Sequence, residues 1–184
     1  MDTLLPVLEP FDWPRRDDCS CRPLLDGVRA TGLPLVALSQ QLEPLLVYLT
    51  PARLEKLGIG RDAAEARALD NLGRITAEWT VVQSATPTGA WLELHVHQGP
   101  MAAERILDHS ELARLSTDRI GDDSAALAIP RRGLLLATST TSALDGAFPR
   151  VVRGLFEEAV EAVDSALSPH VYVAERGRLV GLLS

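Results

Sequence analysis

The sequence has few aromatic residues, one lysine and two cysteines. Aromatic residues make up 4% of its 184 residues, so leucine, valine, isoleucine and alanine must fill most of the core. Cys19 and Cys21 are separated by one residue, and a disulfide across so short a span is strained. We therefore expect free thiols in a reducing compartment.

Long apolar runs are scarce as well. No stretch reaches the roughly 20 apolar residues that a membrane-spanning helix needs. The segment from Met1 to Pro6 has no positive charge and no sustained apolar run, which argues against a usual signal peptide. Together with the expected thiols, these features predict a cytoplasmic protein that does not bind a membrane.

The charge balance is acidic, with a formal net charge of -7. Proteins that bind duplex DNA usually present a basic face to its phosphates. Here the arginines are spread along the chain, and the only adjacent pairs are Arg15–Arg16 and Arg131–Arg132. We therefore expect no nucleic-acid partner.

Length and proline content predict the domain organisation. A chain of 184 residues suits one domain. The first part of the chain contains Pro6, Pro10, Pro14 and Pro23, a density that disfavours helix and central strand. We expect an extended, proline-rich N-terminal arm over residues 1–23 and a single α+β domain over residues 24–184.

Hydrophobic periodicity and turn residues predict the elements of that domain. Short apolar runs indicate strand pairs over 34–38 and 45–49, 79–85 and 90–97, 125–129 and 134–137, and 171–173 and 179–182. Amphipathic stripes indicate helices over 61–77 and 148–167, and Thr50-Pro51 predicts the start of a shorter helix. The pattern predicts an α+β fold, with an antiparallel or mixed sheet built from hairpins and covered by amphipathic helices.

The sharpest candidate for chemistry is the segment Glu93-Leu94-His95-Val96-His97. In a strand, residues two apart project to the same side, so Glu93, His95 and His97 face one point. Two imidazoles and a carboxylate suit zinc or non-haem iron. The alternative interpretation is that the three side chains form the wet face of a half-buried strand. Because short motifs often match by chance, we favour this second interpretation.

Asn71, Arg131 and Arg132 are candidates for a binding surface. The two arginines lie in the turn expected between residues 129 and 134, where hairpin tips are exposed. Asn71 falls inside the helix expected over 61–77. Asparagine is a mediocre helix former, so we expect its side chain to hydrogen-bond to a neighbouring loop.

Several segments, taken in order, carry a resemblance to a known family. They are Val47–Pro51 continued through Leu54–Ile59 to Ala68–Leu72, then Ala103–Leu107, Ala128–Leu135 and Leu167–Pro169. These segments resemble the YtpQ-like family of uncharacterised bacterial proteins, over most of residues 34–175. Leu57, Glu104 and Gly133 depart from the family's Trp, Ser and Asp. The resemblance implies a cytoplasmic α+β domain and brings no established activity.

These patterns support two hypotheses about function. The leading one is a non-catalytic binding or interaction module, which either forms a homodimer or binds an unidentified protein partner, because no acid, base and nucleophile set is recognisable. The rival is a metal-dependent enzyme of the hydrolase type, in which zinc or iron held by Glu93, His95 and His97 activates water. No other cofactor is expected.

Overall fold

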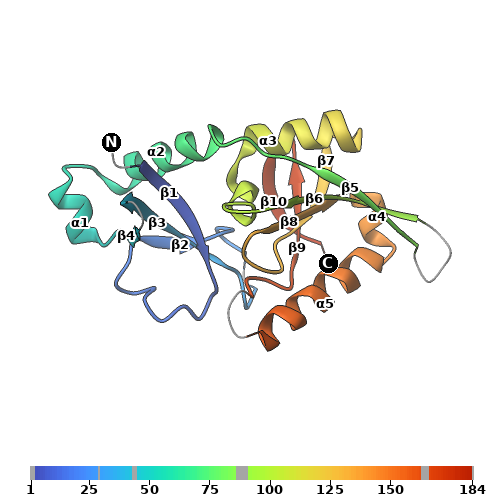
Figure 1. Cartoon of the computed structure of the whole chain (residues 1–184), viewed down its shortest axis with the longest axis horizontal. Helices are drawn as coiled ribbons and strands as arrows, with labels where there is room; N and C mark the ends of the chain where they lie inside the picture. Colours follow the sequence, from blue (N-terminus) through green and yellow to red (C-terminus); the bar gives the residue numbers. More distant parts are fainter. Residues whose placement is uncertain (1–2, 29, 43–44, 86–90, 163–165, 184) are drawn as a thin grey trace. The chain divides into compact units, whose positions relative to one another are not determined.

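The computed structural model of the chain describes residues 3–28, 30–42, 45–85, 91–162 and 166–183. The chain forms two compact units, which we call unit 1 (Met1–Thr76) and unit 2 (Ala77–Ser184). Both units combine helices with an antiparallel sheet, which confirms the α+β class (Figure 1). The division differs from the expected boundary at residue 23, because residues 3–9 form a buried strand within the sheet of unit 1.

Unit 1 is built on a four-stranded sheet. Its strands are β1 (Thr3–Glu9), β2 (Cys21–Pro23), β3 (Leu35–Leu42) and β4 (Leu45–Tyr48). β3 pairs antiparallel with each of the other three strands, and the β3–β4 pair confirms the strand pair predicted from the sequence. Arg22 in β2 is 2.5 Å from Glu65 in a helix of this unit, which ties sheet and helix together.

Helices α1 (Pro51–Lys56) and α2 (Arg61–Gly73) follow the sheet of unit 1. The Thr50 hydroxyl caps α1 by accepting the Arg53 N–H at 3.2 Å, as the sequence predicts. The helices cover a core made of Leu4, Leu38, Leu49, Leu54, Ala64 and Ala68. α2 ends at Gly73, short of the predicted end at Ala77, and Ile75, which lies beyond this end, is 39% exposed.

Unit 2 is built on a six-stranded sheet in the order β10-β9-β7-β8-β6-β5. Its strands are β5 (Thr80–Ala85), β6 (Trp91–Gln98), β7 (Ser124–Ala128), β8 (Leu134–Thr138), β9 (Val171–Glu175) and β10 (Arg178–Leu182). The antiparallel pairs β5–β6, β7–β8 and β9–β10 confirm the predicted hairpins. The turn that the sequence Thr-Pro-Thr-Gly predicts at residues 86–89, between the two strands of the first pair, lies outside the described residues. The two edges of this sheet are β5 and β10.

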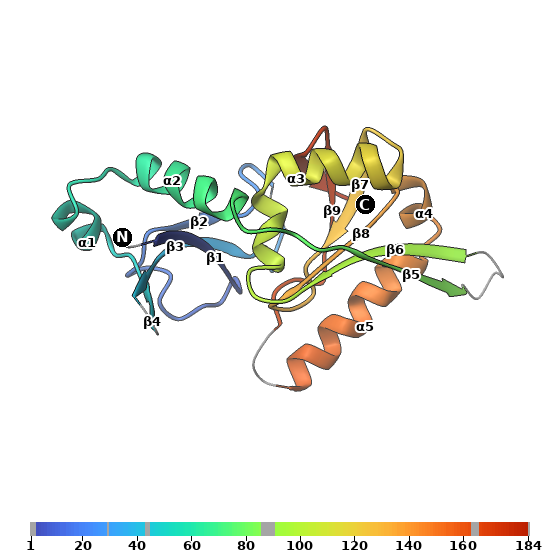
Figure 2. The same ribbon diagram turned by 45° about the horizontal axis from the view of Figure 1, so that its top comes forward.

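Helices lie on both faces of this sheet (Figure 2). They are the 3₁₀ helix η1 (Ala103–Leu107), α3 (His109–Arg114), the π-helix η2 (Leu115–Ile120), α4 (Thr140–Leu144) and α5 (Ala147–Glu161). Phe148 and Val152 of α5 pack on Leu92 and Leu94 of β6, and α3 with η2 lies on the opposite face. α5 ends at Glu161, short of the predicted end at residue 167. Within the described residues, no helix has the length and apolarity to cross a membrane.

Candidate functional site

The structure buries two of the three predicted metal ligands. His95 and His97 are 4% and 6% exposed, whereas the Glu93 side chain is 50% exposed. The wet-face interpretation is therefore wrong for both histidines. They lie opposite the β6 residues that pack on α5, on the face where α3 and η2 lie, so the strand is covered on both sides.

His95 is a buried imidazole whose ring nitrogens have few polar contacts. Its Nε2 lies 3.4 Å from Oε1 of Glu93, and its Nδ1 has no hydrogen-bond partner within the described part of the chain. Burial lowers the pKa of His95; the Glu93 carboxylate opposes this shift and Arg119 adds to it. The ring is therefore neutral at pH 7.

His97 has a structural role at the base of the β5–β6 hairpin. Its Nδ1 donates to the carbonyl oxygen of Glu78 at 2.8 Å, and its ring centroid is 5.5 Å from that of Trp79. Glu78 and Trp79 immediately precede β5. His97 therefore fastens the start of that strand to the end of β6.

The three predicted ligands do not form one metal site. Over the described ranges, no group of three His, Cys, Asp or Glu side chains is arranged to hold a metal ion. Glu93 and His95 are neighbours, but His97 is directed to the backbone of Glu78.

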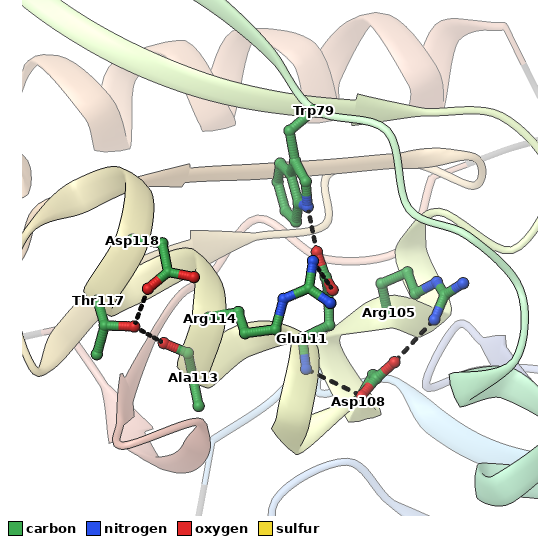
Figure 3. A network of polar contacts seen from close by, with 8 residues as sticks. All are labelled: Trp79, Arg105, Asp108, Glu111, Ala113, Arg114, Thr117 and Asp118. Atoms are coloured by element: carbon green, nitrogen blue, oxygen red, sulfur yellow. Dashed lines mark hydrogen bonds and ion pairs between the residues drawn. The ribbon is translucent and has the colours of Figure 1, made fainter.

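A polar network extends the anchor of β5 to helix α3 (Figure 3). The indole Nε1 of Trp79 donates to Oε1 of Glu111 at 2.7 Å, and Nη2 of Arg114 is 3.5 Å from Oε2 of the same carboxylate. Trp79 is 8% exposed, so its indole N–H needs this partner. The network fixes the residue that immediately precedes the edge strand.

Arg105 lies beside this network and is the largest fully buried side chain described. Its Nη1 donates to Oδ2 of Asp108 at 2.7 Å, and Oδ1 of Asp108 accepts the Glu111 N–H at 3.1 Å. Asp108 thus pairs a buried charge and caps α3. Sequence reasoning missed this role, although Asp108 followed three residues later by Glu111 is a helix-start signature.

The edge strand β5 is exposed and uncharged. Thr80, Val81, Val82, Gln83 and Ala85 are all exposed, with Val81 at 51% and Val82 at 47%. Its sequence, Thr-Val-Val-Gln-Ser-Ala, contains no charged side chain. Trp91, which pairs with Ala85 across the hairpin, is 69% exposed. This strand and Trp91 form the surface that we call the β5 edge.

The candidates Asn71, Arg131 and Arg132 lie elsewhere. Asn71 Nδ2 donates to the carbonyl oxygen of Leu4 at 3.0 Å, so its partner is strand β1 instead of a loop and its role is structural. Arg131 and Arg132 are exposed in the turn between β7 and β8, as predicted. Arg131 also forms an isolated antiparallel bridge with Ala166.

Comparisons with known proteins give no family for this chain. A scan against protein-family models found no match, and searches of curated proteins and of solved structures found none either. The resemblance to the YtpQ-like family stays a prediction.

Proposed function

We propose that this chain is a protein-interaction module that assembles through the β5 edge, and that the strand added there is β5 of a second copy. The observation that carries the proposal is an exposed edge strand with no charged side chain. Such an edge presents unpaired backbone N–H and C=O groups, which are a template for a further strand.

The other edge of the same sheet supports this choice. In natural sheets, charges, bulges and irregular strands protect the edges from pairing with a further strand. β10 carries Arg178, and its register with β9 shifts between Leu179 and Gly181. β5 pairs with β6 in unbroken register from Thr80 to Ala85 and has neither protection. Of the two edges of this sheet, β5 therefore has the regular backbone that a second strand requires.

A second copy suits β5 better than a charged partner does. A two-fold axis brings the same strand against itself, so both sides of the contact present valine and neutral polar residues. No like charges meet there, although the whole chain has a net charge of -7. A charged partner segment finds no complementary charge on β5.

Trp91 supplies contact area beyond the backbone. Tryptophan is enriched among the residues that dominate binding energy, and here it is 69% exposed. It shares a sheet face with Ala85, its cross-strand partner. The anchors at Trp79 and His97 hold the start of β5 in place before a partner arrives, which lowers the ordering cost of association.

The hydrolase hypothesis has less support, because His97 is engaged with the Glu78 carbonyl oxygen and no described group of three ligands forms.

For the cellular location, the free thiols of Cys19 and Cys21 support the proposal of a reducing, cytoplasmic compartment.

The test is native mass spectrometry of the chain and two lysine variants. We expect the parent to show twice the chain mass of 19.9 kDa. Val82→Lys places two like charges near each other in the symmetric contact, so we expect this variant to be monomeric. Val82 is 47% exposed, so the lysine head stays in water in the monomer.

The matched control is Val180→Lys on β10. Val180 is 53% exposed, so this variant adds the same charge at a similarly exposed position on the other edge. We expect it to remain a dimer. A monomeric parent, or a Val82→Lys variant that stays dimeric, contradicts the proposal.

A further inference from the structure

The way in which two copies align at the β5 edge follows from the sheet face that each side chain occupies; this inference rests on the proposed dimer. Residues directly opposite in an antiparallel pair project to the same face, and residues two apart in a strand do so as well. The face that contains His95 therefore holds two sets of side chains, namely Trp91, Glu93 and His95 of β6 with Ala85, Gln83 and Val81 of β5.

Two-fold symmetry limits the possible registers. When two edge strands pair antiparallel within one continuous sheet, the axis that relates them is perpendicular to the sheet. The same face of both copies then lies on the same side, so the odd-numbered residues of β5 meet only one another across the contact. Within β5, an axis at Val82 or at Gln83 leaves the longest paired segment, 80–84 or 81–85.

The side chain of Gln83 distinguishes the two registers. Its Nε2 donates to Oε2 of Glu93 at 3.3 Å, which leaves the second N–H and the carbonyl oxygen of the amide for a partner. An axis at Gln83 places the amides of the two copies opposite each other, where each donates to the other's carbonyl oxygen. An axis at Val82 places each amide opposite Val81 of the other copy, which has no polar group. Because a covered polar group without a partner is costly, Gln83 favours the axis at its own position.

Trp91 and Val81 favour the same register. An axis at Gln83 puts Val81 of one copy opposite Ala85 of the other, and Ala85 pairs with Trp91. Because alanine is small, the indole of Trp91 extends across it toward Val81 of the second copy. Trp91 is 69% and Val81 51% exposed, so this row covers two apolar side chains, and the symmetry produces it twice. An axis at Val82 offers a single pair of Val82 side chains instead.

We propose that the two copies align with Gln83 at the two-fold axis, so that residues 81–85 of one copy pair with residues 85–81 of the other. The contact then has a central polar row, in which the two Gln83 amides connect the Glu93 carboxylates of both copies. On each side of it lies an apolar row of Trp91, Ala85 and the second copy's Val81. The contact thus selects a strand with a neutral amide at its centre and apolar residues two positions away, which is the pattern of β5 itself.

Disulfide cross-linking of cysteine variants tests the register. The full-length variants are oxidised with glutathione disulfide, and the linked peptides are identified by mass spectrometry, which separates them from products of Cys19 and Cys21. Residues directly opposite have Cα atoms about 5 Å apart, which a disulfide spans. Diagonal neighbours are about 7–8 Å apart, which is too far.

We expect Gln83→Cys to link to itself, and Val81→Cys to link to Ala85→Cys after subunit exchange between the two variants. Val82→Cys should not exceed the collision level, which Val180→Cys on β10 defines because Val180 is 53% exposed. Links at Val82→Cys, or between Val81→Cys and Gln83→Cys, in a protein that keeps the dimer mass would overturn the register alone. A monomeric mass without links above the collision level would contradict the proposed dimer as well.

A pair of charge variants tests the central polar row without an oxidant. Gln83→Glu keeps the shape of the side chain, removes its N–H donors and places two carboxylates opposite each other. We expect the Kd of its dimer at pH 7, measured by sedimentation equilibrium, to rise at least about ten-fold. Thr80→Glu is the control, because it adds the same charge to the same exposed strand outside the segment 81–85, so its Kd should change much less. Equal weakening by the two variants contradicts the position of Gln83 at the axis.

Discussion

The two edges of the sheet in unit 2 differ in a way that the sequence of each strand explains. β10 has a charged residue, a glycine and a register shift, whereas β5 is uncharged, regular and exposed. The two strands occupy equivalent positions at opposite ends of one sheet. Because natural sheets protect their edges from further pairing, the proposed assembly through β5 explains why this edge has no such protection.

The start of β5 is anchored by side-chain contacts of Trp79 and His97. Trp79 is bonded to Glu111, and Asp108 joins the same helix to the buried Arg105. The exposed strand is thus attached, through Glu111 and Asp108, to the buried Arg105 side chain. Substitutions in these anchors, in the proposed contact surface and at the buried histidine test how the β5 edge is held in place and whether it forms the dimer contact.

The largest expected effect is on stability, from Asp108→Ala. Among the described residues, Asp108 is the only hydrogen-bond partner of the Arg105 guanidinium, so the substitution removes that partner and uncaps α3. Because it leaves a buried charge without a partner, we expect it to lower the free energy of unfolding by about 3 kcal/mol. Urea denaturation measures this change. Asp118→Ala is the control, because Asp118 is exposed and its loss should cost less than about 0.5 kcal/mol. Equal stability of the two variants would show that the anchor is unimportant.

The next effect concerns association. Trp91→Ala is expected to weaken dimerisation by about 2 kcal/mol, or roughly thirty-fold in Kd, with little change in monomer stability. Sedimentation equilibrium measures the dissociation constant. Leu45→Ala is the matched control, since Leu45 is a similarly exposed apolar residue (65%) in unit 1. If both variants dimerise like the parent, Trp91 does not belong to the contact.

A smaller effect is expected from Trp79→Phe. This variant keeps an aromatic ring and loses the indole N–H that donates to Glu111. A hydrogen bond to a charged acceptor contributes about 1.5 kcal/mol, so stability should fall by that amount and the amides of Thr80 and Val81 should exchange faster. Unchanged hydrogen exchange at these amides would show that the network does not stabilise the edge strand.

The smallest effect is a pH dependence from His95. Its pKa is lowered in the folded chain by burial, against the opposing Glu93, so the unfolded chain binds a proton first as the pH falls. The stability that His95 contributes is therefore present above its unfolded pKa of about 6.5 and is lost as the pH falls from there toward the lower folded pKa. His95→Gln should flatten the dependence of unfolding free energy on pH in this window. If the variant and the parent have the same slope, the pH dependence of the unfolding free energy in this window comes from other groups.

Local signals in the sequence predict much of the fold. The Thr50-Pro51 start of α1 and the β7–β8 hairpin depend on neighbouring residues, and both are confirmed. The ends of α2 and α5 are predicted too far along the chain, because a continuing apolar pattern does not reveal where packing stops. The strand β1 is missed because proline density suggested an arm, although Pro6 is accommodated in the sheet.

The candidate site is harder to predict because burial comes from distant segments. The alternation in β6 indicates one wet face, but the second layer of helices covers His95 and His97. Arg105 is missed for the same reason, since an arginine in a short helix is usually solvated. The exposure of β5 depends on strand order in the sheet, which no local pattern encodes.

The most direct test of the central claim is hydrogen exchange of the unmodified chain over a range of protein concentrations, read at the two edges. Dimerisation through β5 predicts that the amides of residues 80–85 become more protected as concentration rises, whereas those of residues 178–182 do not change. Exchange at β5 that is independent of concentration, or protection that grows at β10 instead, would contradict the account.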